Sequence, residues 1–447
     1  MQPVDTVIAA RWIVPVEPAG RVLEDHALVI DRGRILDLCP TATARERYDA
    51  RSWETRPAHV LLPGLVNAHT HVAMSLLRGL ADDLPLSTWL NEHIWPAEGR
   101  LVNREFVRDG ARLALREMLL GGTTCFADMY YFPDTVGDVA ADAGMRAVLG
   151  LIVIEFPTPW AKDADEYLER GLALHDRIRE HPLLHAAFAP HAPYTVADTT
   201  LSRVRRLADE LELPIHMHVH ETAAEVTDYE REHGVRPLAK LDTLGLVSPA
   251  LMAVHMTQVT PDEVSRLAEA GASVVHCPRS NLKLASGFCP VADYAAAGVN
   301  LALGTDGAAS NNRLDMLGEL QVAALLAKGA SGDPTALDAA SALEMATLGG
   351  ARALGLVETA GSLVPGKSAD VIALDLSAPG CRPVLNVLSQ IVYAAGREQV
   401  SDVWIAGRAR VLKGALVPEA DRALALSETQ WAARVRQNDT TEANAHG

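Results

Sequence analysis

Eight short apolar runs alternate with amphipathic stretches through the middle of this chain, and this alternation constrains the fold more than any other feature. We predict strands at 64–68, 123–128, 146–154, 184–189, 214–219, 251–255, 272–276 and 299–304. Eight strand–helix units predict an α/β fold, a (β/α)8 TIM-like barrel. The alternative, an open doubly wound sheet, is weakened because no glycine-rich phosphate loop follows the first strand.

Most of the segments between these runs have helical periodicity, namely 105–120, 163–180, 200–211 and 261–270. The last of them has clear end signals. Thr260 and Glu263 have the spacing of a capping box around Pro261, and Gly271 is a C-terminal stop.

The two ends of the chain differ from the middle, because they contain short strands and turns without long helical stretches. Strand-like runs occur at 4–9, 27–31 and 33–36, and again at 369–374 and 400–405. We expect them to pair into a small β-sandwich domain composed of residues 1–62 and 362–447, beside a barrel domain of residues 63–361.

Histidines collect where the predicted strands end. Eight of the 16 histidines lie in these segments, and Asp306 follows the last strand. The eight are His69, His71, His191, His216, His218, His220, His255 and His276. Because the carboxyl ends of barrel strands converge at one mouth, this distribution predicts a metal site there.

A ligand set of three imidazoles and one carboxylate follows from this pattern. His69 and His71 share one side of a strand by their i, i+2 spacing, and Asp306 supplies the carboxylate. The third imidazole is one of the three histidines of the fifth strand. Such a set suits Zn²⁺ first and also Fe²⁺. We expect a single divalent metal, since the third and fourth strands contain no lysine that could form a bridging carbamate.

Composition excludes several classes of function. The formal net charge of −17 argues against binding polymeric nucleic acid or an anionic membrane. The five cysteines are scattered without a CxxC pair, so we expect no disulfide framework and a cytoplasmic location. No signal peptide and no membrane span are expected, because the N-terminus lacks a basic region followed by an apolar one and no run of about 18 apolar residues occurs.

Several longer motifs carry a family resemblance. They are PGLVNAHTHVAMSLLRGLADDLPLSTWLNEHIWPAE, APHAPYT, HMHVHET, CPRSNLKLASG and GTDGAASNNRLDM, followed near the C-terminus by GSLVPGKSAD. With these motifs the chain resembles the amidohydrolase superfamily, in the branch of 5-methylthioadenosine/S-adenosylhomocysteine deaminases and related chlorohydrolases. The resemblance covers nearly the whole chain, and the loop that ends at Glu98 is more specific to the deaminases than the two short metal motifs.

The resemblance implies a ligand set and a catalytic group. The family's H-x-x-E spacing selects His218 as the third imidazole ligand beside His69, His71 and Asp306, and Glu221 as the acid/base. The metal would lower the pKa of bound water so that hydroxide attacks the ring carbon bearing the amine. Glu221 would protonate the adjacent ring nitrogen, His255 would orient the water, and Asp306 would take and pass on a proton.

Further residues are implied to bind the substrate. Glu98 would grip the two hydroxyls of a ribose, and His191 would contact the purine or the ribose. Trp89 and Trp95 would form an apolar wall, unless they pack a lid or a subunit contact. Arg146 resembles a substrate-side arginine of the family, but its position at the start of a strand suits a structural ion pair equally well.

The implied activity is hydrolytic deamination of the adenine ring of 5′-methylthioadenosine, S-adenosylhomocysteine or adenosine, which yields the inosine analogue and ammonia. The substrate would be a free nucleoside, and the family resemblance implies a homo-oligomer, a dimer or tetramer. Two alternatives stay open. One is a deaminase of guanine or a pterin, or a triazine chlorohydrolase. The other is an inactive barrel scaffold, which would have no need of the complete ligand and acid/base set.

Overall fold

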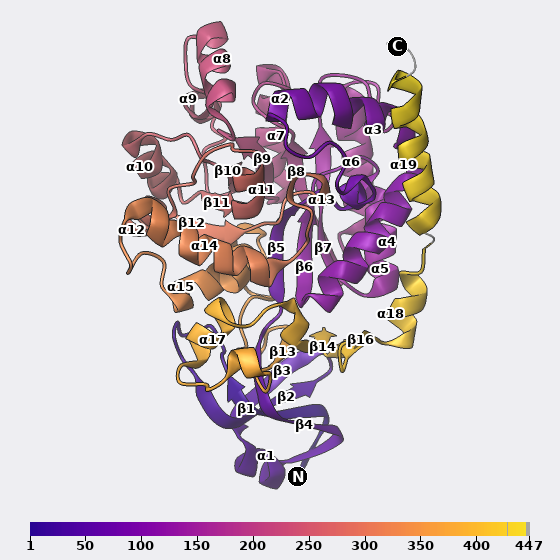
Figure 1. Cartoon of the computed structure of the whole chain (residues 1–447). Coiled ribbons are helices and arrows are strands. Elements are labelled where there is room, and N and C mark those ends of the chain that lie inside the picture. The colour runs from indigo at the N-terminus through magenta and orange to yellow at the C-terminus, as the bar shows by residue number, and fades with distance from the viewer. Residues whose placement is uncertain (427, 444–447) are drawn as a thin grey trace.

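The computed structural model describes residues 1–426 and 428–443 of the chain (Figure 1). Eight parallel strands follow one another around a barrel in chain order. They are β5 (Leu65–Thr70), β6 (Thr123–Asp128), β7 (Arg146–Val153), β8 (Leu184–Pro190), β9 (Ile215–Val219), β10 (Leu251–His255), β11 (Ser273–His276) and β12 (Asn300–Leu303). Each lies within two residues of its predicted range, and the predicted barrel is confirmed.

The first and last barrel strands are joined by a side chain. Nδ2 of Asn67 on β5 donates to Oγ1 of Thr305 (2.7 Å), just after β12, and Oδ1 of Asn67 accepts from the Thr305 backbone N–H (3.0 Å). The N–H of Asp306 then donates to the carbonyl of His69 (3.0 Å). These bonds join β5 to the segment after β12, at the end of the barrel where His69 and Asp306 lie.

Helices surround the barrel (Figure 1). They are α4 (Arg104–Leu120), α5 (Pro133–Ala143), α6 (Ala164–Ile178), α7 (Asp198–Leu211), α8 (Ala223–His233), α9 (Pro237–Thr243), α10 (Pro261–Ala270), α11 (Pro278–Lys283), α12 (Val291–Ala297), α13 (Ala308–Asn311), α14 (Met316–Ser331), α15 (Ala339–Glu344), η3 (Met345–Gly349) and α16 (Gly350–Ala353). The predicted capping box of α10 is present, and Gly271 ends that helix with φ 67°.

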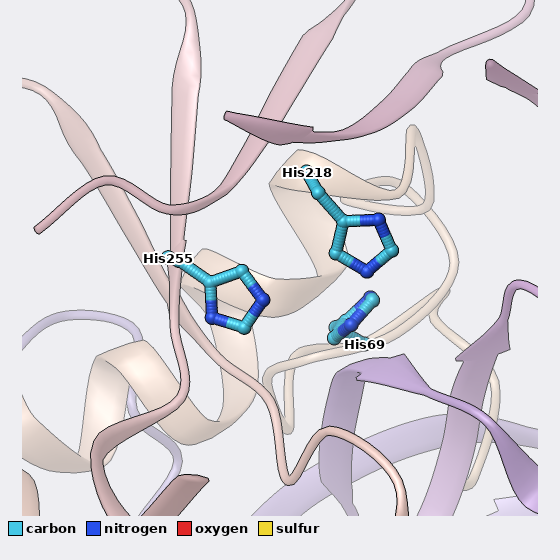
Figure 2. A group of neighbouring side chains, drawn as sticks. All are labelled: His69, His218 and His255. Atoms are coloured by element: carbon cyan, nitrogen blue, oxygen red, sulfur yellow. The ribbon is translucent and has the colours of Figure 1, made fainter. Parts of the chain in front are cut away.

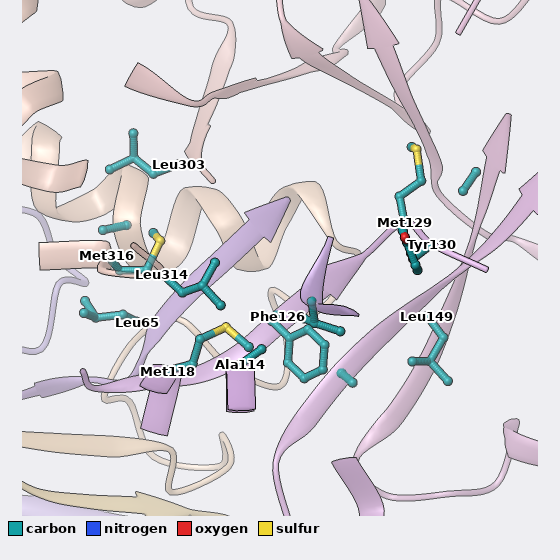
Figure 3. Close-up of a cluster of buried hydrophobic side chains, with 14 of the residues drawn as sticks. Leu65, Ala114, Met118, Phe126, Met129, Tyr130, Leu149, Leu303, Leu314 and Met316 are labelled. Carbon is teal, nitrogen blue, oxygen red and sulfur yellow. The ribbon is translucent and has the colours of Figure 1, made fainter. Parts of the chain in front are cut away.

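Apolar side chains fill the space between the barrel and its helices (Figure 3). Phe126 of β6 and Leu149 of β7 belong to the same buried cluster as Ala114 and Met118 of α4. Burying a side chain of this size contributes about 1.5–3 kcal/mol. The cluster therefore fixes the positions of the strands whose ends carry the site.

A second, eight-stranded sheet contains both ends of the chain, so the predicted sandwich takes the form of one sheet with the strand order β16-β15-β14-β13-β4-β1-β2-β3. Its strands are β1 (Gln2–Ile13), β2 (Leu23–Asp31), β3 (Arg34–Pro40), β4 (Tyr48–Pro63), β13 (Val371–Asp375), β14 (Val400–Ile405), β15 (Arg408–Leu412) and β16 (Ala415–Leu416). Short helices accompany it: α1 (Thr41–Arg47), η4 (Pro379–Cys381), α17 (Val387–Tyr393) and η5 (Arg397–Gln399). The long strand β4, which joins the two halves, is absent from our sequence prediction.

This sheet meets the barrel at the amino ends of the barrel strands. The carbonyl of Asp370 accepts from the N–H of Gly64 just before β5, and its carboxylate pairs with Arg146 at the start of β7. The last helices, α18 (Pro418–Ala423) and α19 (Glu428–Ala443), run beside the barrel instead (Figure 1). There Nε1 of Trp431 donates to Asp109 of α4 at 2.8 Å.

A long insertion between β5 and α4 lies at the opposite, carboxyl end of the barrel. It consists of η1 (Val72–Leu77), α2 (Leu86–Thr88), the π-helical turn η2 (Trp89–Ile94) and α3 (Trp95–Leu101). Its length favours a functional lid. Among the described residues, none of the helices has the length and apolar character needed to cross a membrane.

Candidate active site

Imidazole and carboxylate groups converge at the carboxyl end of the barrel. One ligand-type atom from each of His69, His71 and Asp306 lies within 4.8 Å of the others, and the same holds for His69, His218 and His255. Figure 2 shows the rings of His69, His218 and His255 pointing toward a common centre. Nε2 of His69 is buried and makes no hydrogen bond, although Oδ1 of Asp306 lies 3.3 Å away. We call His69, His71, His218 and Asp306 the cation group.

The other ring nitrogen of each histidine in the cation group is held by the protein. Nδ1 of His69 bonds Nε2 of His216 (2.8 Å), Nδ1 of His71 bonds the Met129 carbonyl (2.6 Å), and Nδ1 of His218 bonds the His191 carbonyl (2.9 Å). Such outer contacts fix the tautomer and ring orientation of metal-binding histidines. All three therefore leave Nε2 free for a cation.

The charges of the cation group also suit a metal. Burial lowers the pKa of His69 to about 3, so this ring is neutral. Burial alone would raise the pKa of Asp306, but His69 and His71 hold it well below its usual value. Burial likewise opposes charge on His71, yet Asp306 raises its pKa to about 9. The site thus favours positive charge beside Asp306, and a divalent cation would replace the proton there.

Asp306 is fixed by its neighbours and by its backbone. Its Oδ2 accepts from Oγ of Ser280 and from Oγ of Ser310, both at 2.6 Å, so that Oδ1 faces the histidines. Asp306 and His255 both have left-handed backbones, with φ 60° and 74°. Strained residues of this kind cost about 1–3 kcal/mol each and concentrate at functional sites.

Glu221 and His255 lie together beside the cation group. Oε2 of Glu221 is 3.7 Å from Nε2 of His255, whose Nδ1 bonds Oδ1 of Asn281 (2.8 Å). Burial raises the pKa of Glu221, which favours its protonated form. A carboxylic acid next to an imidazole is suited to proton transfer.

A cavity opens above these groups, with about 760 Å³ of empty space including its mouth. Small-molecule sites have about 300–1,000 Å³. Its lining includes His71, His218, Glu221, His255 and Asp306 together with the predicted substrate residues Trp89, Trp95, Glu98 and His191. Trp89 is buried and Trp95 is 42% exposed, and both line the cavity.

Glu98 is a buried carboxyl group in this cavity. The hydroxyl of Tyr130 donates to its Oε1 at 2.5 Å. Burial raises the pKa of Glu98 to about 7, although the Tyr130 hydrogen bond acts in the opposite direction. His191 bonds Oγ1 of Thr195 through Nδ1 (3.1 Å), and burial lowers its pKa to about 4. Both side chains are therefore oriented and present acceptors toward the cavity.

Arg146 is the exception among the predicted site residues, because the structure does not bring it to this cavity. It lies at the start of β7, at the far end of the barrel, and is 1% exposed. Its Nε donates to Asp370 (2.8 Å), and Nη2 donates to Ser368 (2.9 Å). These contacts correspond to the structural ion pair that its position at the start of a strand allowed.

Three further histidines from the predicted strand ends, His216, His220 and His276, lie outside the cation group. His216 supports His69, and Nε2 of His220 accepts from the N–H of Leu238 (3.1 Å). His276 is buried, and neither of its ring nitrogens has a partner among the described residues.

Sequence reasoning missed several residues that orient the site. No orienting role was predicted for Tyr130, Asn67, Ser280, Asn281 or Ser310. Tyr130 and Ser310 each come shortly after the end of a barrel strand, which is the signal that could have found them. Asn67 precedes the histidines within β5, where nothing in the sequence pointed to Thr305.

Comparisons with known proteins agree with this geometry. The model of the amidohydrolase family matches residues 60–410. A 5-methylthioadenosine/S-adenosylhomocysteine deaminase of Teredinibacter turnerae is 50% identical over 428 residues, which is 96% of this chain and 97% of that protein. A protein of the same name from Saccharophagus degradans is 48% identical over 92% of each chain.

Solved structures give the same result. An adenosine deaminase from Xanthomonas campestris with bound zinc superposes with a TM-score of 0.96 and 54% identity, over 98% of this chain and 99% of that one. A zinc-containing atrazine chlorohydrolase from Arthrobacter aurescens shares the fold at 22% identity, with a TM-score of 0.86 over 97% and 99% of the two chains. This chain is therefore a metal-dependent hydrolytic deaminase of the amidohydrolase family, in the group of the 5-methylthioadenosine/S-adenosylhomocysteine deaminases.

Proposed function

We propose that this enzyme deaminates the adenine ring of 5′-methylthioadenosine, S-adenosylhomocysteine or adenosine and releases ammonia and the inosine analogue. The observation that carries the proposal is the position of two buried carboxyl groups in one cavity. Glu221 lies beside the cation group, where the ring would react, and Glu98 lines the part formed by the lid. The names of the related proteins support the same substrates.

The cation group would hold one divalent metal, for which we propose Zn²⁺, with Fe²⁺ as the alternative. Three free Nε2 atoms and Oδ1 of Asp306 form a nitrogen-rich donor set that suits either metal. When bound, such a metal lowers the pKa of a coordinating water from about 15.7 toward about 7.

The reaction then depends on proton transfers by this chain's residues. Nε2 of His255 orients the attacking water, and Asp306 accepts its proton. Glu221, whose protonated form burial favours by raising its pKa, donates a proton to the ring nitrogen next to the carbon that carries the amine. The proton on Asp306 passes to the leaving amine, which departs as ammonia. The hydroxyl left on the ring carbon gives its proton to the Glu221 carboxylate as the carbon–oxygen double bond forms, so both carboxyl groups regain their starting states. Each of these proton transfers by a positioned side chain increases the rate about 10²–10⁴-fold.

Glu98 would distinguish a nucleoside from a bare heterocycle. A carboxylate has two acceptor oxygens for the two neighbouring hydroxyls of ribose, and the Tyr130 hydroxyl orients it. His191 would contact the purine or the ribose beside it. Guanine, pterins and chlorotriazines have no such diol, so a buried Glu98 would be an uncompensated cost in an enzyme for those substrates.

The deciding experiment is a steady-state screen of five compounds with the metal-loaded enzyme, following ammonia or chloride release. The compounds are adenosine, 5′-methylthioadenosine, S-adenosylhomocysteine, guanine and a chlorotriazine. We expect turnover of the three nucleosides only. Turnover of guanine or the triazine without turnover of any nucleoside would refute the proposal. A protein that fails to take up stoichiometric metal during loading and turns over none of the compounds would favour a scaffold.

Substitution of Glu98 tests the ribose assignment. Glu98→Ala should raise KM for 5′-methylthioadenosine at least tenfold, since hydrogen bonds to a charged group contribute about 1.5–3 kcal/mol. It should change KM for a base analogue without ribose far less. Equal effects on both compounds would remove Glu98 from ribose binding.

Three expectations outside the site remain proposals. We propose a cytoplasmic location, because the five free cysteines fit a reducing compartment. We propose a homo-oligomer, a dimer or tetramer, which light scattering after size exclusion would test. We also propose that residues 63–361 form one domain and that residues 1–62 and 362–447 form the other.

A further inference from the structure

Two tight turns meet at the amino ends of the barrel strands, far from the cation group along the barrel axis. Arg32 and Gly33 join β2 to β3, and Ala406 and Gly407 join β14 to β15. All four residues have φ between 48° and 77°, as in type I′ hairpins. A Cβ on Gly33 would lie only 2.7 Å from the carbonyl oxygen of Ala406, so the two turns pack directly against each other.

Each turn is followed by an arginine that lines a common cavity. Arg34 follows the first turn and Arg408 the second, and Arg410 of β15 lines the same space. The cavity has about 1440 Å³ of empty space including its open mouth. The barrel contributes the other wall, including Arg146 and Pro182. We call this space the arginine cavity.

The positive charge of the arginine cavity is only partly compensated. Arg146 is neutralised by Asp370, and Arg32 lies 3.0 Å from Asp31. Nη1 of Arg34 donates to the Gly366 carbonyl (2.7 Å), which carries no charge. Within residues 1–426 and 428–443, the guanidinium groups of Arg408 and Arg410 make no hydrogen bond or ion pair.

The acidic side chain of the lining does not change this balance. Asp5 accepts from the backbone N–H of Arg32 (2.7 Å) and pairs with Arg51 (3.3 Å), so its charge is already engaged. Three arginines thus remain without a carboxylate partner in a chain whose formal net charge is −17.

Arg410 is the residue that most needs a partner. It is 9% exposed, and its Nε is buried without an acceptor. Its guanidinium lies against the C-terminal end of α5, where a Cβ on Gly144 would be 2.2 Å from Cζ. The helix dipole there offsets part of the charge. Burial, and then the charge of Arg408, lower the pKa of Arg410, while the charge of Glu419 raises it.

We propose that the arginine cavity binds a phosphate group, presented by inorganic phosphate or by a small phosphate monoester. Guanidinium groups match the oxygens of phosphate in pairs, and charge-assisted bonds of this kind are the strong ones. A dianion bound in the cavity lined by these three arginines, Arg34, Arg408 and Arg410, offsets the repulsion between Arg408 and Arg410. Because the surrounding chain is acidic, an enclosed ligand fits this site and a nucleic-acid strand does not.

Calorimetric titration of the metal-loaded enzyme tests the proposal. The probes are inorganic phosphate and ribose 5-phosphate, in a buffer without phosphate. We expect saturable binding of one equivalent per chain. Arg408→Gln is the decisive variant, because Arg408 is exposed and its side chain makes no hydrogen bond or ion pair with the described residues. It should weaken binding about tenfold or more, since one charge-assisted hydrogen bond is lost.

Control variants separate this site from others. Arg21→Gln removes an exposed arginine outside the cavity and should leave binding unchanged. Arg34→Gln should weaken it as Arg408→Gln does, and all three variants should keep the wild-type kcat/KM for deamination. Binding of ribose 5-phosphate alone would identify a phosphorylated metabolite as the ligand. Binding of both ribose 5-phosphate and inorganic phosphate would show that the phosphate group is sufficient for binding.

Two results would overturn the proposal. One is the absence of saturable binding for both probes. The other is phosphate binding of wild-type strength in Arg408→Gln, which would place the anion elsewhere. Phosphate bound at the cation group would be recognised because it would also inhibit deamination.

Discussion

At the scale of single residues, the carboxyl groups of Asp306, Glu221 and Glu98 differ in pKa because their surroundings differ. Asp306 is held ionised by two histidines, whereas Glu221 and Glu98 have pKa values raised by burial. Environments that push the pKa values of neighbouring acids apart assign their chemical roles. The first is thus suited to bind a cation, and the second to donate a proton.

Replacing Glu221 should separate proton donation from metal binding. Glu221→Gln keeps the size of the side chain but removes the acidic proton, so kcat should fall about 10²–10⁴-fold. The metal content, measured by mass spectrometry of the purified protein, should stay at one per chain. A variant with less than a tenfold loss of kcat would show that Glu221 is not the acid.

The pH dependence of substrate binding should report Glu98. Below its pKa of about 7 the carboxyl group is protonated and accepts poorly from a diol, and above it the carboxylate accepts from both hydroxyls. KM for 5′-methylthioadenosine should therefore fall about tenfold between about pH 6 and pH 8. Glu98→Gln should flatten this profile, and an unchanged slope in the variant would assign the titration to another group.

At the scale of elements, strand β9 shows how alternation is used. His216 and His218 lie two residues apart and share one side of the strand, and they do different work. His218 belongs to the cation group, while His216, deeper in the barrel, holds Nδ1 of His69. His220 lies just past the strand with φ 52°, and its Nε2 accepts a hydrogen bond from the backbone of α9.

Removing the support of His69 should weaken the metal site. His216→Leu leaves Nδ1 of His69 without its partner, and outer contacts of this kind are worth about 10–100-fold in metal affinity. Competition with a chelator measures the loss. Met217→Leu, on the same strand but on its other side, is the matched control and should bind metal normally. Equal affinities in the two variants would contradict a positioning role for His216.

Local signals predicted some elements almost to the residue. The capping box of Thr260 and Glu263 and the stop at Gly271 gave α10 its bounds, because all the groups involved are neighbours in sequence. Strand β4 was missed for the opposite reason. Its residues from Asp49 to His59 are largely polar and partly exposed, and its partners β1 and β13 are fixed by tertiary pairing.

The whole molecule is held together where its two ends meet the barrel. Arg146 of β7 and Asp370 beside β13 form an ion pair in which both side chains are 2% exposed. Asp370 also accepts from Ser368 and from the N–H of Ala406, so the pair is fully hydrogen-bonded. This network connects the terminal sheet to the barrel.

Breaking the pair should cost stability and leave substrate binding intact. Arg146→Ala leaves a buried carboxylate without its partner, which costs about 3–5 kcal/mol. Urea unfolding measures this loss, and KM of the folded enzyme should not change. Arg11→Ala, which breaks an exposed pair with Asp25, should cost at most about 1 kcal/mol. A raised KM in Arg146→Ala would instead return Arg146 to substrate binding.

The sequence by itself determined the barrel, its eight strands and the histidines and acids at the strand ends, because hydrophobic periodicity and residue spacing are local properties. The tertiary structure decided which atoms of the cation group face one another. It brought Asn67 to Thr305, Ser310 to Asp306 and Tyr130 to Glu98, and it moved Arg146 to the opposite end of the barrel. Hydrogen bonds that orient a side chain come from separate strands and loops, and their partners meet only when the barrel has closed.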